Sequence, residues 1–358
     1  MRKVMIAALV LSMCTVLAAC GKGNVITGYK KGDLELGQYK GLTYTPMQIN
    51  VTDEEIEEKI QSDLKSDRYL SEIEGKNTVE AGDVVSIDYE CIVDGVPFER
   101  GKGTKDDLVV GSDANTFFEG LDDALIGKEP GQFDVDITFP DNYYLYPELS
   151  SKTATFKINL KSINEYAYPE LTDEWVSTHT GGESTTVADY REKIRNELIG
   201  KQQSSSESDM RYQILKQVFA NTKFNVDLSK EVHDYCTNLK ATQDVMASQY
   251  GVSTPLFFEY QYGLSEAYYD DFMEAQSKII IQFNYIRSAI VEAENIQATD
   301  EEAEALAETA RESYGCSTNE EFYKYILDNF KADGKTYLRE QVKLNKATDI
   351  LFDTAVAK

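Results

Sequence analysis

Residues 82–99 read GDVVSIDYECIVDGVPFE, and they predict two paired strands. Apolar and polar residues alternate toward Tyr89, which is the period of a strand with one buried face. Asp94-Gly95 is a tight-turn pair, because a two-residue hairpin turn requires positive φ angles that Asp and Gly tolerate. The apolar pattern resumes beyond this pair at Phe98. The stretch therefore predicts a β-hairpin.

Two later segments carry the same period of two. Apolar side chains alternate with polar ones through residues 133–139 and again through 156–160. The one plausible helix of this region covers residues 117–126. Together these features predict a compact antiparallel sheet wrapped around a single short helix, within residues 79–166.

The pattern changes to a helical period after Pro169. Apolar residues recur every three or four positions, which places them on one face of each helix. Three such stripes are Met210, Ile214 and Val218; Ile279, Phe283, Ile286 and Ile290; and Phe322, Ile326 and Phe330. The helical pattern is weaker in residues 204–208 and in residues 221–226. The sequence thus predicts an α+β protein in which the sheet is followed by an all-α domain, residues 167–358.

Residues 33–78 precede the sheet and are predicted to pack with the helical domain. Leu34 to Val51 reads as one or two extended segments, after which a helix begins at Thr52. The Thr52 side chain can accept from the amide three residues on while Glu55 reaches back, a capping box. Thr299 to Glu302 repeats the pattern and predicts a second helix start.

The first residues predict export and a lipid anchor. Arg2 and Lys3 precede an apolar run that is shorter than the roughly 20 residues needed to span a bilayer, which is typical of a secretory signal. The run ends in residues 17–21, LAACG, which resemble the bacterial lipoprotein signal box. That resemblance implies cleavage of residues 1–19 and a diacylglyceryl group on Cys20. An ordinary signal peptide with an incidental cysteine is the alternative.

The predicted location follows from this anchor. Residues 20–32 are short, polar and glycine-bearing, so they read as a flexible tether. Two acyl chains hold a protein to a membrane far better than one. We therefore expect the mature protein on the extracytoplasmic face of the cell membrane.

Charge and rare residues exclude several classes of function. Acidic residues outnumber basic ones by 62 to 36, a net charge of −26 that disfavours nucleic acid as a partner. Only two histidines are present, and three cysteines remain beyond Cys20, without any C-x-x-C spacing. No metal, cofactor, zinc site or Ser-His-type triad is therefore expected. The pairing of these cysteines, Cys91, Cys236 and Cys316, stays open.

The β-rich region resembles FKBP-type prolyl isomerases, and above all the isomerase domain of bacterial trigger factor. The segments that carry the resemblance are 82–89, 93–99, 120–127 (GLDDALIG), 139–143 (FPDNY) and 154–160 (ATFKINL). Outside this domain, residues 34–59, 169–174 and 294–302 are similar to the linker and helical chaperone arms of trigger factor. The Gly-Phe-Arg loop of that family's ribosome-docking domain does not occur in this sequence. The resemblance therefore implies a relative that works without the ribosome.

The resemblance implies peptidyl-prolyl cis-trans isomerase activity. An X-Pro bond rotates past a barrier of ~20 kcal/mol, and an apolar cradle that fits the twisted amide better than the planar one lowers it. Carried over by motif, the cradle residues are Tyr89, Phe98, Phe117, Phe118, Leu121, Tyr143 and Phe156. Glu99 occupies the place of a family carboxylate, which implies polar contact with the substrate or with pocket neighbours.

Three departures from the family pattern weaken the cradle. Asp106 and Leu121 each stand where the family has an aromatic residue, and the loop 143–147 is one residue longer. These aromatic residues could also be no more than the core of a small β-domain.

Three functions remain open. The first is an isomerase and folding chaperone for unfolded or newly exported polypeptides, held by aromatic-rich helical segments at 256–262 and 268–272. The second is a protein of the same fold that binds proline-containing segments without catalysis. The third is a tethered solute-binding or adhesion lipoprotein, which the late all-α stretch disfavours.

Overall fold

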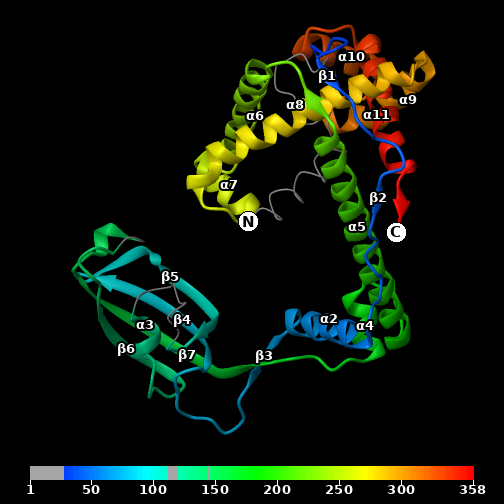
Figure 1. Cartoon of the computed structure of the whole chain (residues 1–358). Coiled ribbons are helices and arrows are strands. Elements are labelled where there is room, and N and C mark those ends of the chain that lie inside the picture. Colours follow the sequence, from blue (N-terminus) through cyan, green and yellow to red (C-terminus); the bar gives the residue numbers. More distant parts are fainter. Residues whose placement is uncertain (1–27, 112–119, 144–145) are drawn as a thin grey trace. The chain divides into compact units, whose positions relative to one another are not determined.

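The computed structural model describes residues 28–111, 120–143 and 146–358 (Figure 1). Their contacts form two units. The sheet unit is Val51–Leu198, and the helical unit combines residues 28–50 with Ile199–Lys358. The units do not coincide with the predicted segments, because residues 51–78 and 167–198 group with the sheet rather than with the later helices.

The sheet unit contains a five-stranded sheet in which every pairing is antiparallel, as predicted. The strand order is β3-β7-β4-β5, and β6 also pairs with β7 (Figure 1). Its strands are β3 (Tyr69–Glu72), β4 (Val84–Val93), β5 (Val96–Val109), β6 (Gly131–Thr138) and β7 (Thr153–Ala167). The long β7 strand is the centre of the sheet because it has partners on both edges.

The hairpin predicted from residues 82–99 is confirmed as β4 and β5. Its turn residues have φ angles of 52° at Asp94 and 80° at Gly95, the left-handed pair that a tight hairpin requires. The register shifts between Glu90 and Ile92, so β5 bulges opposite Cys91.

The core of the sheet unit follows the predicted alternation. On β7, Phe156, Ile158 and Leu160 are buried while the residues between them are more exposed. The short helix α3 (Leu121–Ala124) places Leu121 and Leu125 in this core with no exposed surface. The helix is shorter than the predicted 117–126, and residues 117–119 lie outside the described part of the chain.

Three helices form a second core in the sheet unit. They are α2 (Asp53–Ser66), α4 (Asp173–His179) and the start of α5 (Val187–Asn221), and they bury Ile56, Ile60, Val176 and Ile194. The capping box predicted at Thr52 and Glu55 is confirmed, with both reciprocal hydrogen bonds formed.

The helical unit is mostly α, as predicted. Its further helices are α6 (Ser229–Gln249), α7 (Thr254–Tyr262), α8 (Tyr269–Ala293), α9 (Asp300–Ala310), α10 (Asn319–Phe330) and α11 (Gly334–Asp353). The extended segments predicted before residue 51 contain only two-residue strands. β1 (Leu34–Glu35) pairs with β8 (Lys223–Phe224), and β2 (Thr43–Tyr44) with β9 (Val356–Ala357).

Glutamine side chains hold the extended segment against α5. Gln213 exchanges two hydrogen bonds with the backbone of Thr45, at 2.9 and 3.0 Å, and Gln202 exchanges two with the backbone of Asn50, at 2.9 and 3.3 Å. Residues 204–208, where the sequence pattern is weaker, form uninterrupted helix. The hydroxyl of Ser205 donates to the backbone carbonyl one turn back, as other hydroxyls in this stretch do.

Part of the predicted tether, residues 20–32, is packed rather than free. The Tyr29 ring meets the Tyr285 ring edge-on at 6.0 Å, and its hydroxyl donates to Glu292 on α8. Burial, and then the Glu292 carboxylate, raise the pKa of Tyr29 to about 12. Tyr29 therefore packs as part of the helical unit because it has specific partners on α8.

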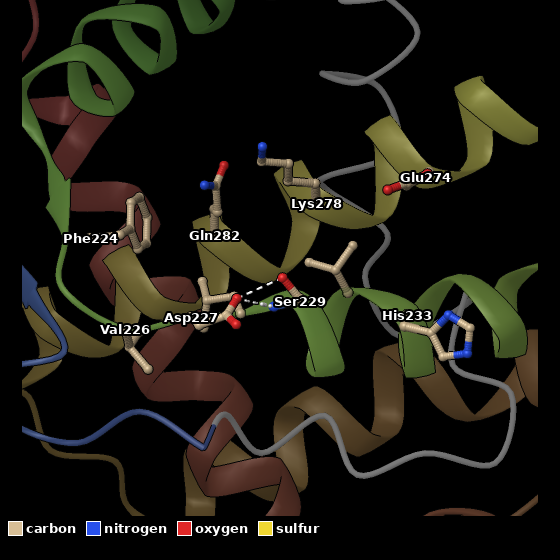
Figure 2. A pocket seen from close by; sticks show the side chains of 10 residues that line it. Phe224, Val226, Asp227, Ser229, His233, Glu274, Lys278 and Gln282 are labelled. Carbon is tan, nitrogen blue, oxygen red and sulfur yellow. Dashed lines mark hydrogen bonds between the residues drawn. The ribbon is translucent and has the colours of Figure 1, made fainter.

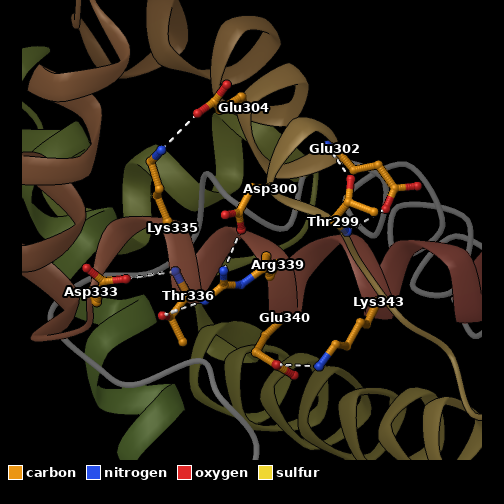
Figure 3. A network of polar contacts seen from close by, with 10 residues as sticks. All are labelled: Thr299, Asp300, Glu302, Glu304, Asp333, Lys335, Thr336, Arg339, Glu340 and Lys343. Carbon is orange, nitrogen blue, oxygen red and sulfur yellow. Dashed lines mark hydrogen bonds and ion pairs between the residues drawn. The ribbon is translucent and has the colours of Figure 1, made fainter.

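Ion pairs join α9 to α11 (Figure 3). Arg339 pairs with Asp300, and Lys335 pairs with Glu304 at 2.8 Å. The capping box predicted at Thr299 and Glu302 is confirmed at the start of α9. These acidic residues therefore act as helix starts and as partners for α11.

No helix in the described ranges is both long enough and apolar enough to span a membrane.

Candidate functional site

Five of the predicted cradle residues contribute to one apolar cluster in the sheet unit. Tyr89 comes from β4, Phe98 from β5, Leu121 from α3, Tyr143 from the loop after β6 and Phe156 from β7. Leu121, Tyr143 and Phe156 are at most 2% exposed, whereas Tyr89 and Phe98 are half-buried. The first three therefore form the floor, and Tyr89 and Phe98 reach the surface. Phe117 and Phe118 lie outside the described residues.

Two aromatic residues that the sequence did not assign to the cradle connect its members. Phe139 stacks on Tyr143 at 4.8 Å and meets Phe156 edge-on at 6.4 Å. Tyr146 lies 6.2 Å from Tyr143 and meets Phe98 edge-on at 5.3 Å. The result is a continuous series, Phe156–Phe139–Tyr143–Tyr146–Phe98, which we call the ring row.

The sequence signalled the burial of Phe139, whereas it gave no role in the site to Tyr146. Phe139 ends the alternating run 133–139, so its burial follows from strand period. Tyr146 lies in the loop recognised as longer than in the family, and only its contact with Phe98 shows that it joins the site.

The side chains that make up the ring row are themselves uncharged. Burial, together with the nearby Tyr146, raises the pKa of Tyr89. Burial also raises the pKa of Cys91 to about 11, so this fully buried thiol stays protonated at neutral pH. An uncharged apolar surface is suited to a neutral, twisted amide and offers no nucleophile.

Glu99 follows Phe98 on β5, and its side chain is exposed. No hydrogen bond or ion pair joins it to another residue within the described part of the chain. Its expected polar contact with the substrate or with pocket neighbours stays a prediction.

Asp106 lies outside the apolar cluster. Its carboxylate pairs with Lys161 at 2.9 Å, and its backbone carbonyl accepts from the Ser86 hydroxyl. Because the side chain is 64% exposed, this position adds no wall to the ring row.

Gly101 allows the bulge of β5 to approach Cys91. A Cβ atom at Gly101 would lie 2.5 Å from Cys91 Cβ and 3.0 Å from Phe98 Cδ1. We expect Gly101→Ala to destabilise the sheet unit by about 1–3 kcal/mol, because a methyl group there overpacks the core and displaces Phe98.

Thermal unfolding measures this effect, with Gly200→Ala as the control. Gly200 lies in α5 with nothing within 4 Å of the position of a Cβ atom, so alanine should stabilise the helix there. A Gly101→Ala protein as stable as the wild type would contradict the close approach.

A separate pocket of about 320 Å³ lies in the helical unit (Figure 2). Figure 2 shows Glu274, Lys278 and Gln282 on α8, facing the segment that leads into α6. The apolar part of its lining is Phe224, Val226, Leu228 and Val232, and the polar part is completed by Asp227, Ser229 and His233. No feature of the sequence pointed to this pocket, because its two sides are distant in the chain.

Two charged side chains that line this pocket, Asp227 and Lys278, differ in whether they have a partner. Asp227 accepts from the Ser229 amide and hydroxyl, which lowers the pKa of the Asp227 carboxyl. Lys278 is exposed and makes no ion pair within the described part of the chain. The pocket can therefore take an apolar side chain beside a polar backbone.

The aromatic-rich helical segments divide between core and surface. Phe258 and Phe272 are buried, and their rings lie 5.2 Å apart. Tyr250, Tyr260 and Tyr268 are 71%, 74% and 50% exposed. These three tyrosines and the exposed Val245 and Met246 lie on or next to α6 and α7 or just before α8, and we refer to them together as the α6–α7 surface.

The three cysteines whose pairing stayed open are free thiols: Cys91, Cys236 and Cys316. Within residues 28–111, 120–143 and 146–358, no group of three or more His, Cys, Asp or Glu side chains could hold a metal ion.

The sheet and its ring row have the architecture of an FKBP-type domain, here in one chain with a helical unit. The family model described as FKBP-type peptidyl-prolyl cis-trans isomerase matches residues 75–161. The model described as bacterial trigger factor protein C-terminus matches residues 186–353.

Known relatives agree with both matches. Trigger factor of Bacillus cereus strain B4264 is 31% identical over 333 residues, covering 91% of this chain and 73% of the relative. Trigger factor of Bacillus thuringiensis strain Al Hakam is 30% identical over the same length, with the same coverage. The chain belongs to the trigger factor family, and the predicted fold class and family are confirmed.

A solved structure is also similar. It comes from work titled "Promiscuous Substrate Recognition in Folding and Assembly Activities of the Trigger Factor Chaperone", and it is 18% identical to this chain, with a TM-score of 0.42. The match covers 89% of this chain and 72% of the other.

Proposed function

We propose that this protein is a peptidyl-prolyl isomerase and folding chaperone for newly exported proteins, tethered to the outer face of the membrane through Cys20. The observation that carries the isomerase is the ring row. It joins a fully buried floor at Phe156 to a half-buried ring at Phe98 through aromatic rings that are themselves uncharged.

The ring row would act on the shape of the amide. During rotation the X-Pro bond loses its conjugation and twists out of plane. Apolar rings that fit the twisted form better than the planar form stabilise the transition state selectively, which raises the rate. Glu99, exposed beside Phe98, would contact the polar backbone of the substrate.

The helical unit would hold the client during this reaction. The α6–α7 surface exposes tyrosine rings, which combine an apolar body with a polar edge and suit contact with varied unfolded chains. Holding a client on the same chain raises the local concentration of its prolines at the ring row.

The tether would place this activity outside the cytoplasm. Its support is the charged start, the short apolar run and the LAACG box ending at Gly21, all of which lie outside the described residues. A protein anchored there would meet clients as they leave the export machinery, with no ribosome involved.

The direct test measures the cis-to-trans rate of an X-Pro peptide with and without the purified protein, alongside suppression of aggregation of an unfolded client. We expect a faster rate and less aggregation. An unchanged rate with folded protein would contradict the isomerase.

One observation favours a second candidate, a holdase without catalysis. Asp106 is tied to Lys161 in solvent and leaves the ring row without a wall that the family pattern has. In that case the same two assays separate, with aggregation suppressed and the isomerisation rate unchanged.

A further inference from the structure

The cationic side chain of Arg100 lies at the outer end of the ring row. The guanidinium carbon of Arg100 lies 5.8 Å from the centroid of the Tyr146 ring. The same ring meets Phe98 edge-on at 5.3 Å. Arg100, Tyr146 and Phe98 therefore form one contiguous rim, which we call the Arg100 rim.

The charge of Arg100 has no carboxylate partner among the residues that the structure describes, whereas nearby cations on β5 do. Lys102 pairs with Glu90 at 3.2 Å, and Lys105 pairs with Asp107. Arg100 is exposed, and its described contact is the Tyr146 ring. It is thus a cation beside an apolar surface with its hydrogen-bond donors available.

We propose that the Arg100 rim selects X-Pro segments that carry an acidic residue next to the proline. This inference rests on the proposed isomerase function and names its preferred substrate class. An extended chain advances about 3.3–3.6 Å per residue, so a residue flanking a proline seated at Phe98 lies within reach of the guanidinium.

The chemistry of the guanidinium supports this preference. Its N–H donors lie in one plane and can form two parallel hydrogen bonds with a carboxylate. Contact with the Tyr146 ring keeps the guanidinium oriented. A basic residue in the same place would be repelled, so attraction and repulsion both contribute to the selection.

The acidic remainder of the protein does not cancel this effect. The chain has a net charge of −26, which would repel an acidic client at long range. At physiological ionic strength, however, charges beyond about 8 Å are largely screened. Contact with Arg100 therefore outweighs the distant carboxylates.

The test uses the full chain in detergent and two sets of proline peptides. Within each set the peptides differ only in having Glu, Gln or Lys next to the proline. The varied residue precedes the proline in one set and follows it in the other. Both kcat/KM for isomerisation and Kd are measured at physiological ionic strength. We expect at least one set in which the Glu peptide is favoured over the Gln peptide about threefold, with Lys disfavoured. High salt should reduce this ratio.

Variants assign the preference to Arg100. Arg100→Gln should bring the Glu/Gln ratio to one, and Arg100→Glu should invert the preference between Glu and Lys. Lys102→Gln removes an equal charge from the same strand, and it should leave the ratio unchanged because Lys102 is already paired with Glu90.

The outcomes separate this inference from the proposed function. One outcome is that the protein accelerates the Gln peptides, but the Glu/Gln ratio of kcat/KM is the same in the wild type and in Arg100→Gln. The proposed specificity is then wrong, and the isomerase activity stands. If no peptide is accelerated, the isomerase fails, and the ratio of Kd values alone decides the specificity. Equal Kd values for Glu and Gln peptides would then overturn both.

Discussion

Phe98→Ala is expected to lower the catalysed rate of X-Pro isomerisation by about ten- to a hundredfold. Phe98 is the half-buried end of the ring row, where a substrate can reach it, and it holds Tyr146 edge-on at 5.3 Å. Loss of one apolar ring contact removes about 1.5–3 kcal/mol, and each 1.36 kcal/mol changes a rate tenfold. The measurement is kcat/KM with a proline peptide.

Phe133→Ala is the matched control for this variant. Phe133 is also half-buried and packs against the same core, but it lies on β6 beside Lys128 and outside the ring row. Both variants lose one ring from the same core, so their unfolding temperatures should fall by similar amounts. Only Phe98→Ala should lose the isomerisation rate, and aggregation suppression should survive in both. Equal loss of rate in the two variants would show that the ring row is merely core.

Cys20→Ser is expected to abolish the incorporation of fatty acid into the protein almost completely. A cysteine thiol accepts the diacylglyceryl group, and a serine hydroxyl in its place does not complete the predicted lipoprotein box. Two acyl chains give stable anchoring, so their loss removes the anchor rather than weakening it. Fractionation of cells and labelling with a radioactive fatty acid measure the change.

Cys14→Ser provides the control, since Cys14 lies inside the predicted signal and would be removed with it. That variant should still take up the label and stay in the membrane fraction. Wild-type protein that takes up no label would refute the lipid anchor and favour an ordinary signal peptide.

Local sequence patterns determined the elements of this fold. The turn pair Asp94-Gly95, the capping boxes at Thr52 and Thr299 and the alternation along β7 each depend on residues close in the chain. Such features follow from φ preferences, hydrogen-bonding reach and periodicity, which neighbouring residues specify. The α+β class and the family could therefore be predicted from the amino-acid sequence.

Local sequence patterns did not predict two features: the continuous helix through residues 204–208 and the packing of the predicted tether. Serines at 204–208 weaken the helical pattern, yet α5 continues because Gln202 and Gln213 on either side bind the backbone of a segment more than 150 residues away in the chain. Tyr29 reads as part of a free tether, yet it packs on Tyr285.

Tertiary structure alone decided the roles within the candidate site. The family motif named Phe98, Leu121, Tyr143 and Phe156, but only the packing separates a buried floor from a surface that a substrate can reach. The recruitment of Tyr146, and with it the position of Arg100, depends on contacts between a loop and a bulged strand more than 40 residues apart. The helical pocket likewise joins α8 to the segment before α6. Sequence periodicity states which face of an element is apolar, whereas the identity of the element packed against that face is a long-range property that only the folded chain shows.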